Sequence, residues 1–144
     1  MDIEVFIQKL RNLQNFANIE GNRLILDNAG LIESMQIKRL GRGKTKENKY
    51  IQKGYSPGYA KRRKKKGLQT NYVDLNFTGE FYESLQVTEE PNFGSFDIIS
   101  DVDYAPHLFK KYEDITGLSE ANAKKLKKVL VTGLEKSIKN YLFG

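Results

Sequence analysis

The stretch LQVTEEPNFGSFDII, residues 85–99, decides the fold class of this chain of 144 residues. Apolar and polar side chains alternate in its C-terminal part, where Phe96 and Ile98 fall on one face and Asp97 on the other. Such alternation is typical of a strand with one buried face. The residues between the two ends, 91–94, are of the types that form turns. The sequence therefore predicts an antiparallel hairpin with strands over 85–89 and 95–99.

Helices are predicted on the N-terminal side of this hairpin. Asp2 can cap a first helix, and we expect Gly21 and Asn22 to interrupt it. Asp27 or Asn28 can cap a second helix, which the glycines at 41 and 43 end. The first helix carries one apolar stripe at spacings of three and four, formed by Ile3, Phe6, Leu10, Leu13 and Ala17.

The segments next to the hairpin complete the predicted fold. Residues 73–77 alternate apolar and polar side chains, and Thr78-Gly79 precedes one helical turn. A short helix over 106–112 follows the hairpin, and Ser119 caps the longest helix, which ends near Leu142. The fold class is therefore α+β: a small antiparallel sheet packed with N-terminal helices and a long C-terminal helix, in a single domain over 1–144.

Composition excludes several kinds of protein. The chain has no Cys and one His, which removes disulfide frameworks and sites that need thiolates or two imidazoles. No run of about 18 apolar residues could span a membrane, and the first residues carry charges where a signal peptide is apolar. We therefore expect a protein that stays in a cytosol-like compartment, with no membrane partner.

Charge is distributed unevenly along the chain. Residues 38–66 contain thirteen Lys or Arg and one acid, Glu47, whereas the remaining residues contain eleven basic and seventeen acidic side chains. Two surfaces of opposite sign are implied. This favours contact with a polyanion, or packing of identical subunits head to tail.

The basic segment has two predicted parts. Residues 41–56 predict a mobile, solvated loop, and Ser56-Pro57 opens a short helix that Gly67 ends. The segment at about 41–67 could contact nucleic acid, contact an acidic protein surface, or face solvent alone. The tyrosines at 50, 55, 59 and 72 could stack on bases, although packing is the favoured interpretation. The candidate contact residues are Lys44, Lys46, Lys61, Arg62, Arg63, Lys64, Lys65 and Lys66.

Other residues give little sign of chemistry. The carboxylates at 97, 101, 103, 113 and 114 lack the spacing of a calcium loop, and His107 has no evident catalytic partner. Gly41-Arg42-Gly43-Lys44-Thr45 lacks the first glycine of a phosphate-binding loop. We predict no catalytic residue, no cofactor and no metal, and hence a protein that is not an enzyme.

Several motifs occur in an order that resembles a known family. They are YSPGYAK at 55–61 with the basic helix after it, VDL at 73–75 with TGEFYESL at 78–85, and KYEDITGLS at 111–119. This order resembles the small tail-completion and neck proteins of long-tailed bacteriophages, although Glu113 stands where glycine is commoner. The resemblance implies an α+β subunit that assembles into a homo-oligomeric ring at the head–tail junction or tail end.

The expected function is therefore a non-enzymatic structural component of a phage virion. Its partners would be copies of itself and other neck or tail proteins, with packaged DNA as a further candidate partner for the basic segment. It would be assembled in the host cytoplasm and then reside in the virion. The alternative is a nucleic-acid-binding accessory protein that uses residues 38–66.

Overall fold

The computed structural model describes residues 1–52, 54–90 and 95–144. Its α+β fold agrees with the predicted class. Two strands form one antiparallel sheet among the described residues. The elements are α1 (Ile3–Arg11), α2 (Leu13–Asp27), α3 (Ala29–Gly41), α4 (Pro57–Lys65), α5 (Glu80–Glu83), β1 (Leu85–Glu89), β2 (Phe96–Ser100), α6 (Ala105–Lys111) and α7 (Glu120–Phe143).

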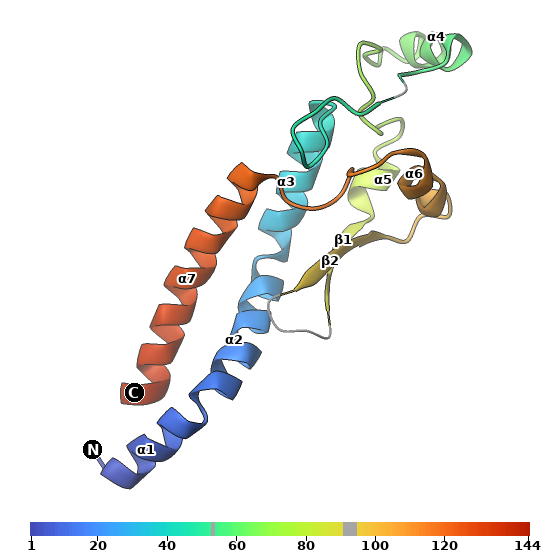
Figure 1. The fold of residues 1–144 in the computed structure, drawn as a ribbon. Coiled ribbons are helices and arrows are strands. Elements are labelled where there is room, and N and C mark those ends of the chain that lie inside the picture. The colour runs from blue at the N-terminus through green and yellow to red at the C-terminus, as the bar shows by residue number, and fades with distance from the viewer. Residues whose placement is uncertain (53, 91–94) are drawn as a thin grey trace.

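The molecule is elongated (Figure 1). Helices α1, α2 and α3 follow one another along the length of the molecule, and α7 runs beside them. The hairpin and α6 lie on the other side of α2 and α3, while α4 occupies the end farthest from both termini. The basic helix is thus at one extremity of the subunit.

Helix α1 begins where the sequence predicts, because the Asp2 carboxylate accepts from the backbone N–H of Glu4 and Val5. The predicted interruption at Gly21-Asn22 is wrong, since α2 continues through both residues to Asp27. A glycine inside a helix costs about 1 kcal/mol relative to alanine. Packing of α2 against α7 offsets that cost.

Helix α7 is unbroken through Gly133. Ser119 caps it, as predicted, by accepting from the backbone N–H of Asn122 at 3.2 Å. A Cβ atom at position 133 would lie 3.1 Å from Cδ2 of Leu24 on α2. The glycine therefore allows α2 and α7 to approach closely.

The hairpin has the predicted strands, with β2 shifted by one residue. Val87 pairs with Ile98 and Leu85 with Ser100. Ile98 is buried, Phe96 is half-buried and Asp97 is exposed, so the predicted buried face is confirmed. The predicted turn, 91–94, lies outside the described residues.

The alternation over residues 73–77 does not produce a strand. This segment is irregular, and Leu75 adopts a left-handed backbone conformation with φ of 58°. No strand among the described residues pairs with this segment. Instead, Arg63, Tyr55 and Tyr82 donate hydrogen bonds to its carbonyl and carboxylate oxygens.

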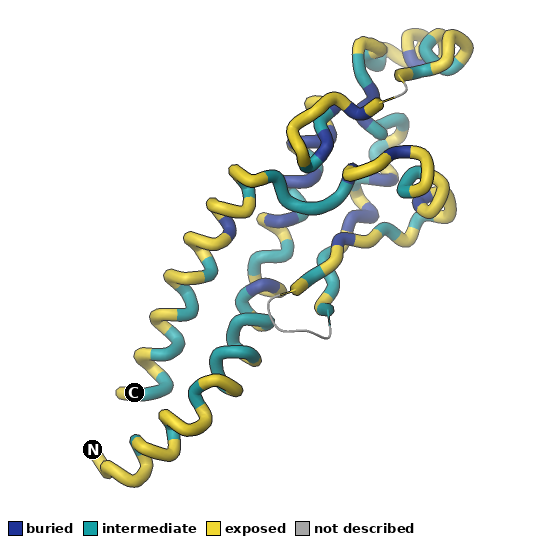
Figure 2. Tube along the Cα trace, viewed as in Figure 1, coloured by how far each residue is buried: buried dark blue, intermediate teal, exposed yellow. Residues whose placement is uncertain are grey.

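The core lies where α2, α3, the hairpin, α6 and the start of α7 meet (Figure 2). Its most deeply buried apolar side chains include Ile32, Leu40, Phe81, Ile115 and Val73. By contrast, α1 has no buried residue, and α7 has one, Leu126. In the part of the chain that the structure describes, no helix is both long and apolar enough to cross a bilayer.

Candidate polyanion and partner contact surface

Residues at its two ends determine where α4 begins and ends. The Ser56 hydroxyl accepts from the backbone N–H of Tyr59 at 3.3 Å, and Pro57 occupies the first helical turn. Gly67 ends the helix in a left-handed conformation with φ of 75°. These features confirm the predicted helix and its boundaries.

Arg63 is the exception within the run of six basic residues. Its side chain is 1% exposed, although the sequence prediction counted it among the residues that contact a partner. Its Nη2 donates to both carboxylate oxygens of Asp74 at 3.1 and 3.2 Å. Its other nitrogens donate to the carbonyl oxygens of Gln69 and Asn76, each at 3.0 Å. Arg63 therefore holds α4 to the segment 69–76 and is not available to an external partner.

Asp74 is the acceptor at the centre of this arrangement. Besides Arg63, its carboxylate accepts from Gln69 Nε2 at 2.8 Å and from the hydroxyl of Tyr55 at 3.1 Å. The Tyr82 hydroxyl donates to the carbonyl oxygen of the same residue. We call Arg63, Asp74, Gln69, Tyr55 and Tyr82 the Arg63 network.

Burial makes the two tyrosines of this network weaker acids. Loss of hydration raises the pKa of Tyr55 to about 12, and the nearby Asp74 carboxylate adds to the increase. Burial likewise raises the pKa of Tyr82, again with a contribution from Asp74. Both phenols are therefore neutral hydrogen-bond donors throughout the physiological pH range.

The tyrosines beside the basic run pack within the protein, as favoured from the sequence. The rings of Tyr55 and Tyr59 meet edge to face with centroids 5.3 Å apart. The hydroxyl of Tyr72 donates to the carbonyl oxygen of Gly41 at 3.2 Å, and its ring lies 6.2 Å from that of Tyr50. Tyr50 is nevertheless 56% exposed.

The other five basic residues of the run are exposed: Lys61, Arg62, Lys64, Lys65 and Lys66. We call them the α4 basic face. Arg62 and Lys66 lie over the ring of Phe77, with Nζ of Lys66 4.4 Å from its centroid. The Arg63 network fixes the helix that carries these charges, so their positions are set before any partner binds.

The two loop lysines predicted as contacts lie elsewhere. The ammonium group of Lys44 lies 3.4 Å from the centre of the Tyr50 ring, and that of Lys46 lies 3.4 Å from a carboxylate oxygen of Asp114. The loop that carries both lysines folds back on itself through the hydrogen bond from Ile51 N to Gly43 O at 2.9 Å. The structure thus separates Lys44 and Lys46 from the α4 basic face.

Gly43 is required by this loop for two reasons. Its φ of 71° is left-handed, and a Cβ atom there would lie 2.4 Å from Cδ2 of Tyr72. The ring of Tyr72 therefore rests directly on the backbone of the loop. This contact joins the segments before and after α4.

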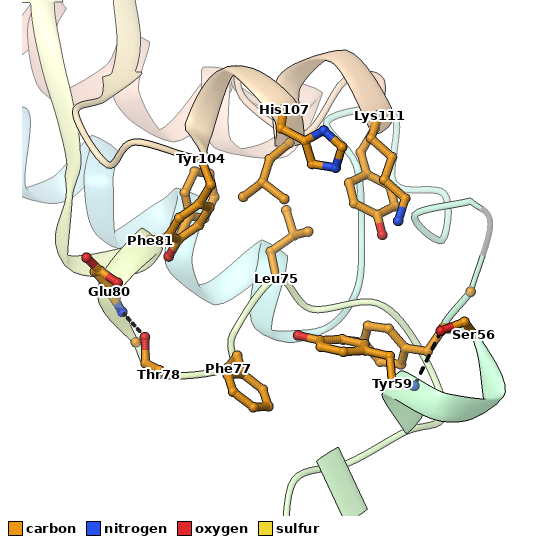
Figure 3. Close-up of a pocket in the computed structure, with 15 residues that line it drawn as sticks. Ser56, Tyr59, Leu75, Phe77, Thr78, Glu80, Phe81, Tyr104, His107 and Lys111 are labelled. Carbon is orange, nitrogen blue, oxygen red and sulfur yellow. Dashed lines mark hydrogen bonds between the residues drawn. The ribbon is translucent and has the colours of Figure 1, made fainter. Parts of the chain in front are cut away.

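A cavity of about 450 Å³ lies between the start of α4 and α6 (Figure 3). Its walls include Tyr59, Leu75 and Phe77 on one side and His107 and Lys111 of α6 on the other. The two hydrogen bonds drawn there are local backbone contacts, from Tyr59 N to Ser56 and from Glu80 N to Thr78. The cavity mainly offers aromatic and aliphatic contact area.

Acidic side chains are concentrated in α5, in the hairpin and in the segments on either side of α6. Between residues 80 and 114 the chain has nine acidic residues and two lysines, and all nine acids are at least partly exposed. They are Glu80, Glu83, Glu89, Glu90, Asp97, Asp101, Asp103, Glu113 and Asp114. We call them the acidic surface. Among the described residues, no group of three or more His, Cys, Asp or Glu is arranged to hold a metal ion.

Comparison with protein families, with curated proteins and with solved structures finds no match to this chain.

Sequence reasoning missed the internal role of Arg63. The six basic residues look alike in the sequence, and the partner Asp74 lies eleven residues away in an irregular segment. A signal was nevertheless present. A helix packed on a protein turns one side inward, so one residue of an all-basic helix requires a buried anionic partner.

Proposed function

We propose that this protein is a non-enzymatic structural component of a phage virion, in the neck or tail-completion region. In this proposal it assembles into a ring through the α4 basic face and the acidic surface of neighbouring copies. Two surfaces of opposite charge on different parts of one subunit suit head-to-tail association, which closes into a ring when the rotation allows it.

One observation carries the proposal: the three stretches that resemble the neck-protein pattern meet in space. Tyr55 from the first stretch and Tyr82 from the second both hydrogen-bond Asp74, which also belongs to the second. Tyr112, from the third, lines the cavity beside α4 together with Tyr59 of the first. The pattern thus describes one structural unit that holds the basic helix at the end of the subunit.

Measurements of mass and negative-stain images of the purified protein test assembly. We expect a discrete oligomer with a ring outline at low salt. Neutralising four residues of the α4 basic face, Lys61→Gln, Arg62→Gln, Lys64→Gln and Lys65→Gln together, should dissociate it. Protein that stays monomeric at every concentration and salt, and that joins no virion protein, would count against the proposal.

A second candidate is a nucleic-acid-binding accessory protein that uses residues 38–66. The contacts of Arg62 and Lys66 with the ring of Phe77 favour it, because aromatic rings beside cations can stack on unpaired bases. Tight binding of single-stranded DNA by a monomer, lost in Phe77→Ala, would favour this candidate over ring assembly.

A further inference from the structure

A second basic surface lies in a groove where part of the basic segment 38–66 meets lysines of α7, which were not among the candidate contact residues. The groove has a volume of about 850 Å³ and lies between α3, the loop after it and the first turns of α7. Its cationic lining residues are Lys38, Arg42, Lys46, Lys124 and Lys125, in addition to the buried Arg39, and its acidic ones are Glu47 and Glu120. Cations from segments about 80 residues apart thus converge on one depression.

Most of these charges are not neutralised within the chain. Lys38, Arg42, Lys124 and Lys125 are exposed, and their side chains make no hydrogen bond or ion pair with any residue that the structure describes. Lys46 contacts Asp114 at 3.4 Å, and both side chains are well exposed. Exposed pairs of this kind contribute about 0–1 kcal/mol and exchange easily for another anion.

A buried arginine fixes the walls of the groove. Arg39 is 2% exposed and donates to the carbonyl oxygens of Ile115 at 2.7 Å, Gly117 at 2.6 Å and Lys44 at 3.2 Å. These bonds join α3 to the loop after it and to the segment that leads into α7. Burial, and the positive charge of Arg42, lower the pKa of Arg39 to about 10, so it remains charged at neutral pH. The segments that carry the exposed cations are therefore held relative to one another before a ligand arrives, which reduces the entropic cost of binding.

The ligand chemistry follows from this lining. Protein interfaces usually have an apolar centre with charges at the rim, whereas nucleic-acid interfaces are more polar and more positive. Here the cations lie along both sides, and Leu31, Met35, Leu118 and Ala121 are the apolar lining residues. The first turn of α7 also borders the groove and presents the positive end of a 24-residue helix.

We propose that this groove binds the sugar–phosphate backbone of a nucleic acid without reading its sequence. Lys38 and Arg42 are one turn apart on the surface at the end of α3, and Lys124 and Lys125 oppose them from α7, so phosphates on a strand between them meet cations from both sides. This inference does not depend on ring assembly, because the groove is formed within one subunit.

The test measures binding of labelled single-stranded and double-stranded DNA of mixed sequence by fluorescence anisotropy at several salt concentrations. The groove variant combines Lys38→Gln, Arg42→Gln, Lys124→Gln and Lys125→Gln. Its matched control combines Lys127→Gln, Lys128→Gln, Lys136→Gln and Lys139→Gln, which remove the same charge from exposed positions on α7 that do not line the groove. Circular dichroism verifies that both variants stay folded.

The groove variant should bind at least about 10-fold more weakly than the wild type at low salt, and the slope of log K against log salt should decrease by about 3. The control variant should lose much less affinity for DNA. Equal losses in the two variants would overturn the proposal, as would a wild type that binds an acidic polypeptide such as polyglutamate but no DNA. Mass measurements on the same variants separate the two proposals, since the groove variant should assemble as the wild type does.

Discussion

At the scale of single residues, the two buried arginines determine where the exposed cations lie. Arg63 holds α4 to the segment 69–76, and Arg39 holds α3 to the segment before α7. Each is a charged side chain whose donors are used inside the protein, while neighbouring basic residues face outward. The chain thus uses a minority of its basic residues for architecture and leaves the rest for contact.

Replacing Arg63 should be far more costly than replacing its neighbour. Arg63→Met leaves the Asp74 carboxylate, in a side chain 11% exposed, without its cation, and we expect the free energy of unfolding to fall by about 3–5 kcal/mol. Arg62→Met, one residue away and exposed, should change it by less than about 0.5 kcal/mol. Urea unfolding followed by circular dichroism measures both. Similar small losses in the two variants would show that the Arg63 network is not structural.

A second residue-scale prediction concerns pH. The Arg23 side chain and the Ser137 hydroxyl, which donates to Glu20 at 2.7 Å, lower the pKa of Glu20 from its ordinary 4.5 to about 2. Because the folded pKa is the lower one, this stabilisation is complete above pH 4.5 and is lost as the pH falls towards 2. The unfolding free energy of Glu20→Gln should therefore change less with pH across this window than that of the wild type. The pH dependence of Ser137→Ala should be intermediate between the two. Identical pH dependence in all three proteins would contradict the assigned contacts.

At the scale of elements, close approach of α2 and α7 holds the elongated part of the molecule together. Few side chains are fully buried there, and aromatic pairs such as Phe16 and Tyr141, with centroids 4.1 Å apart, contribute much of the contact. Gly133 sits at the contact with Leu24. The separation of the two helices is consequently sensitive to side-chain size at this position.

Two glycine substitutions should therefore have opposite effects. Gly133→Leu should push the helices apart and destabilise the protein by about 1–3 kcal/mol. Gly30→Ala, in the first turn of α3 with open space where the Cβ would be, should stabilise it by about 0.4–1 kcal/mol. Thermal unfolding reports both changes as shifts of opposite sign in Tm. A stabilising Gly133→Leu would show that α2 and α7 are not in close contact.

Sequence patterns predicted the elements that depend on local chemistry and failed where distant contacts decide. Asp2, Ser56 and Ser119 cap helices through bonds to residues two or three positions away, so their roles are readable locally. Helix α2 continues through Gly21 because α7 packs on it, and residues 73–77 stay irregular because Arg63 binds them. Neither cause is visible in a short window of sequence.

The same distinction applies to the candidate site. The basic helix and its boundaries were predicted, because Ser56-Pro57 and Gly67 are local signals. The lysines of α7 were not among the candidate contact residues, yet Lys124 and Lys125 line a groove with Lys38 and Arg42. Only the tertiary fold brings residues of α3 and α7 together.

At the scale of the whole molecule, charge is separated by position. The α4 basic face lies at one extremity, and the acidic surface lies on α5, the hairpin and the segments that flank α6 (Figure 1). Electrostatic attraction between unlike surfaces of neighbouring copies is screened by salt, with a Debye length of about 10 Å at 0.1 M. Assembly through these surfaces should therefore weaken as salt increases.

Replacing acidic residues tests the role of the acidic surface in assembly. Asp97→Asn, Asp101→Asn and Asp103→Asn together remove three exposed charges from the acidic surface and should weaken self-association as neutralising the α4 basic face does. Sedimentation velocity compares the variants at one salt concentration. If the triple variant associates as strongly as the wild type, the acidic surface is not the partner of α4.

The most direct test of the central claim, charge-paired assembly into a ring, is the native mass of the purified protein as a function of salt. Charge-paired assembly predicts a discrete oligomer of the 16.5 kDa chain at low salt, which dissociates as salt increases. It also predicts loss of the oligomer at low salt in the variant with Lys61, Arg62, Lys64 and Lys65 changed to Gln, but not in the one with Lys127, Lys128, Lys136 and Lys139 changed to Gln. A wild type that is monomeric at all salt concentrations, or equal loss of mass in both variants, would contradict it.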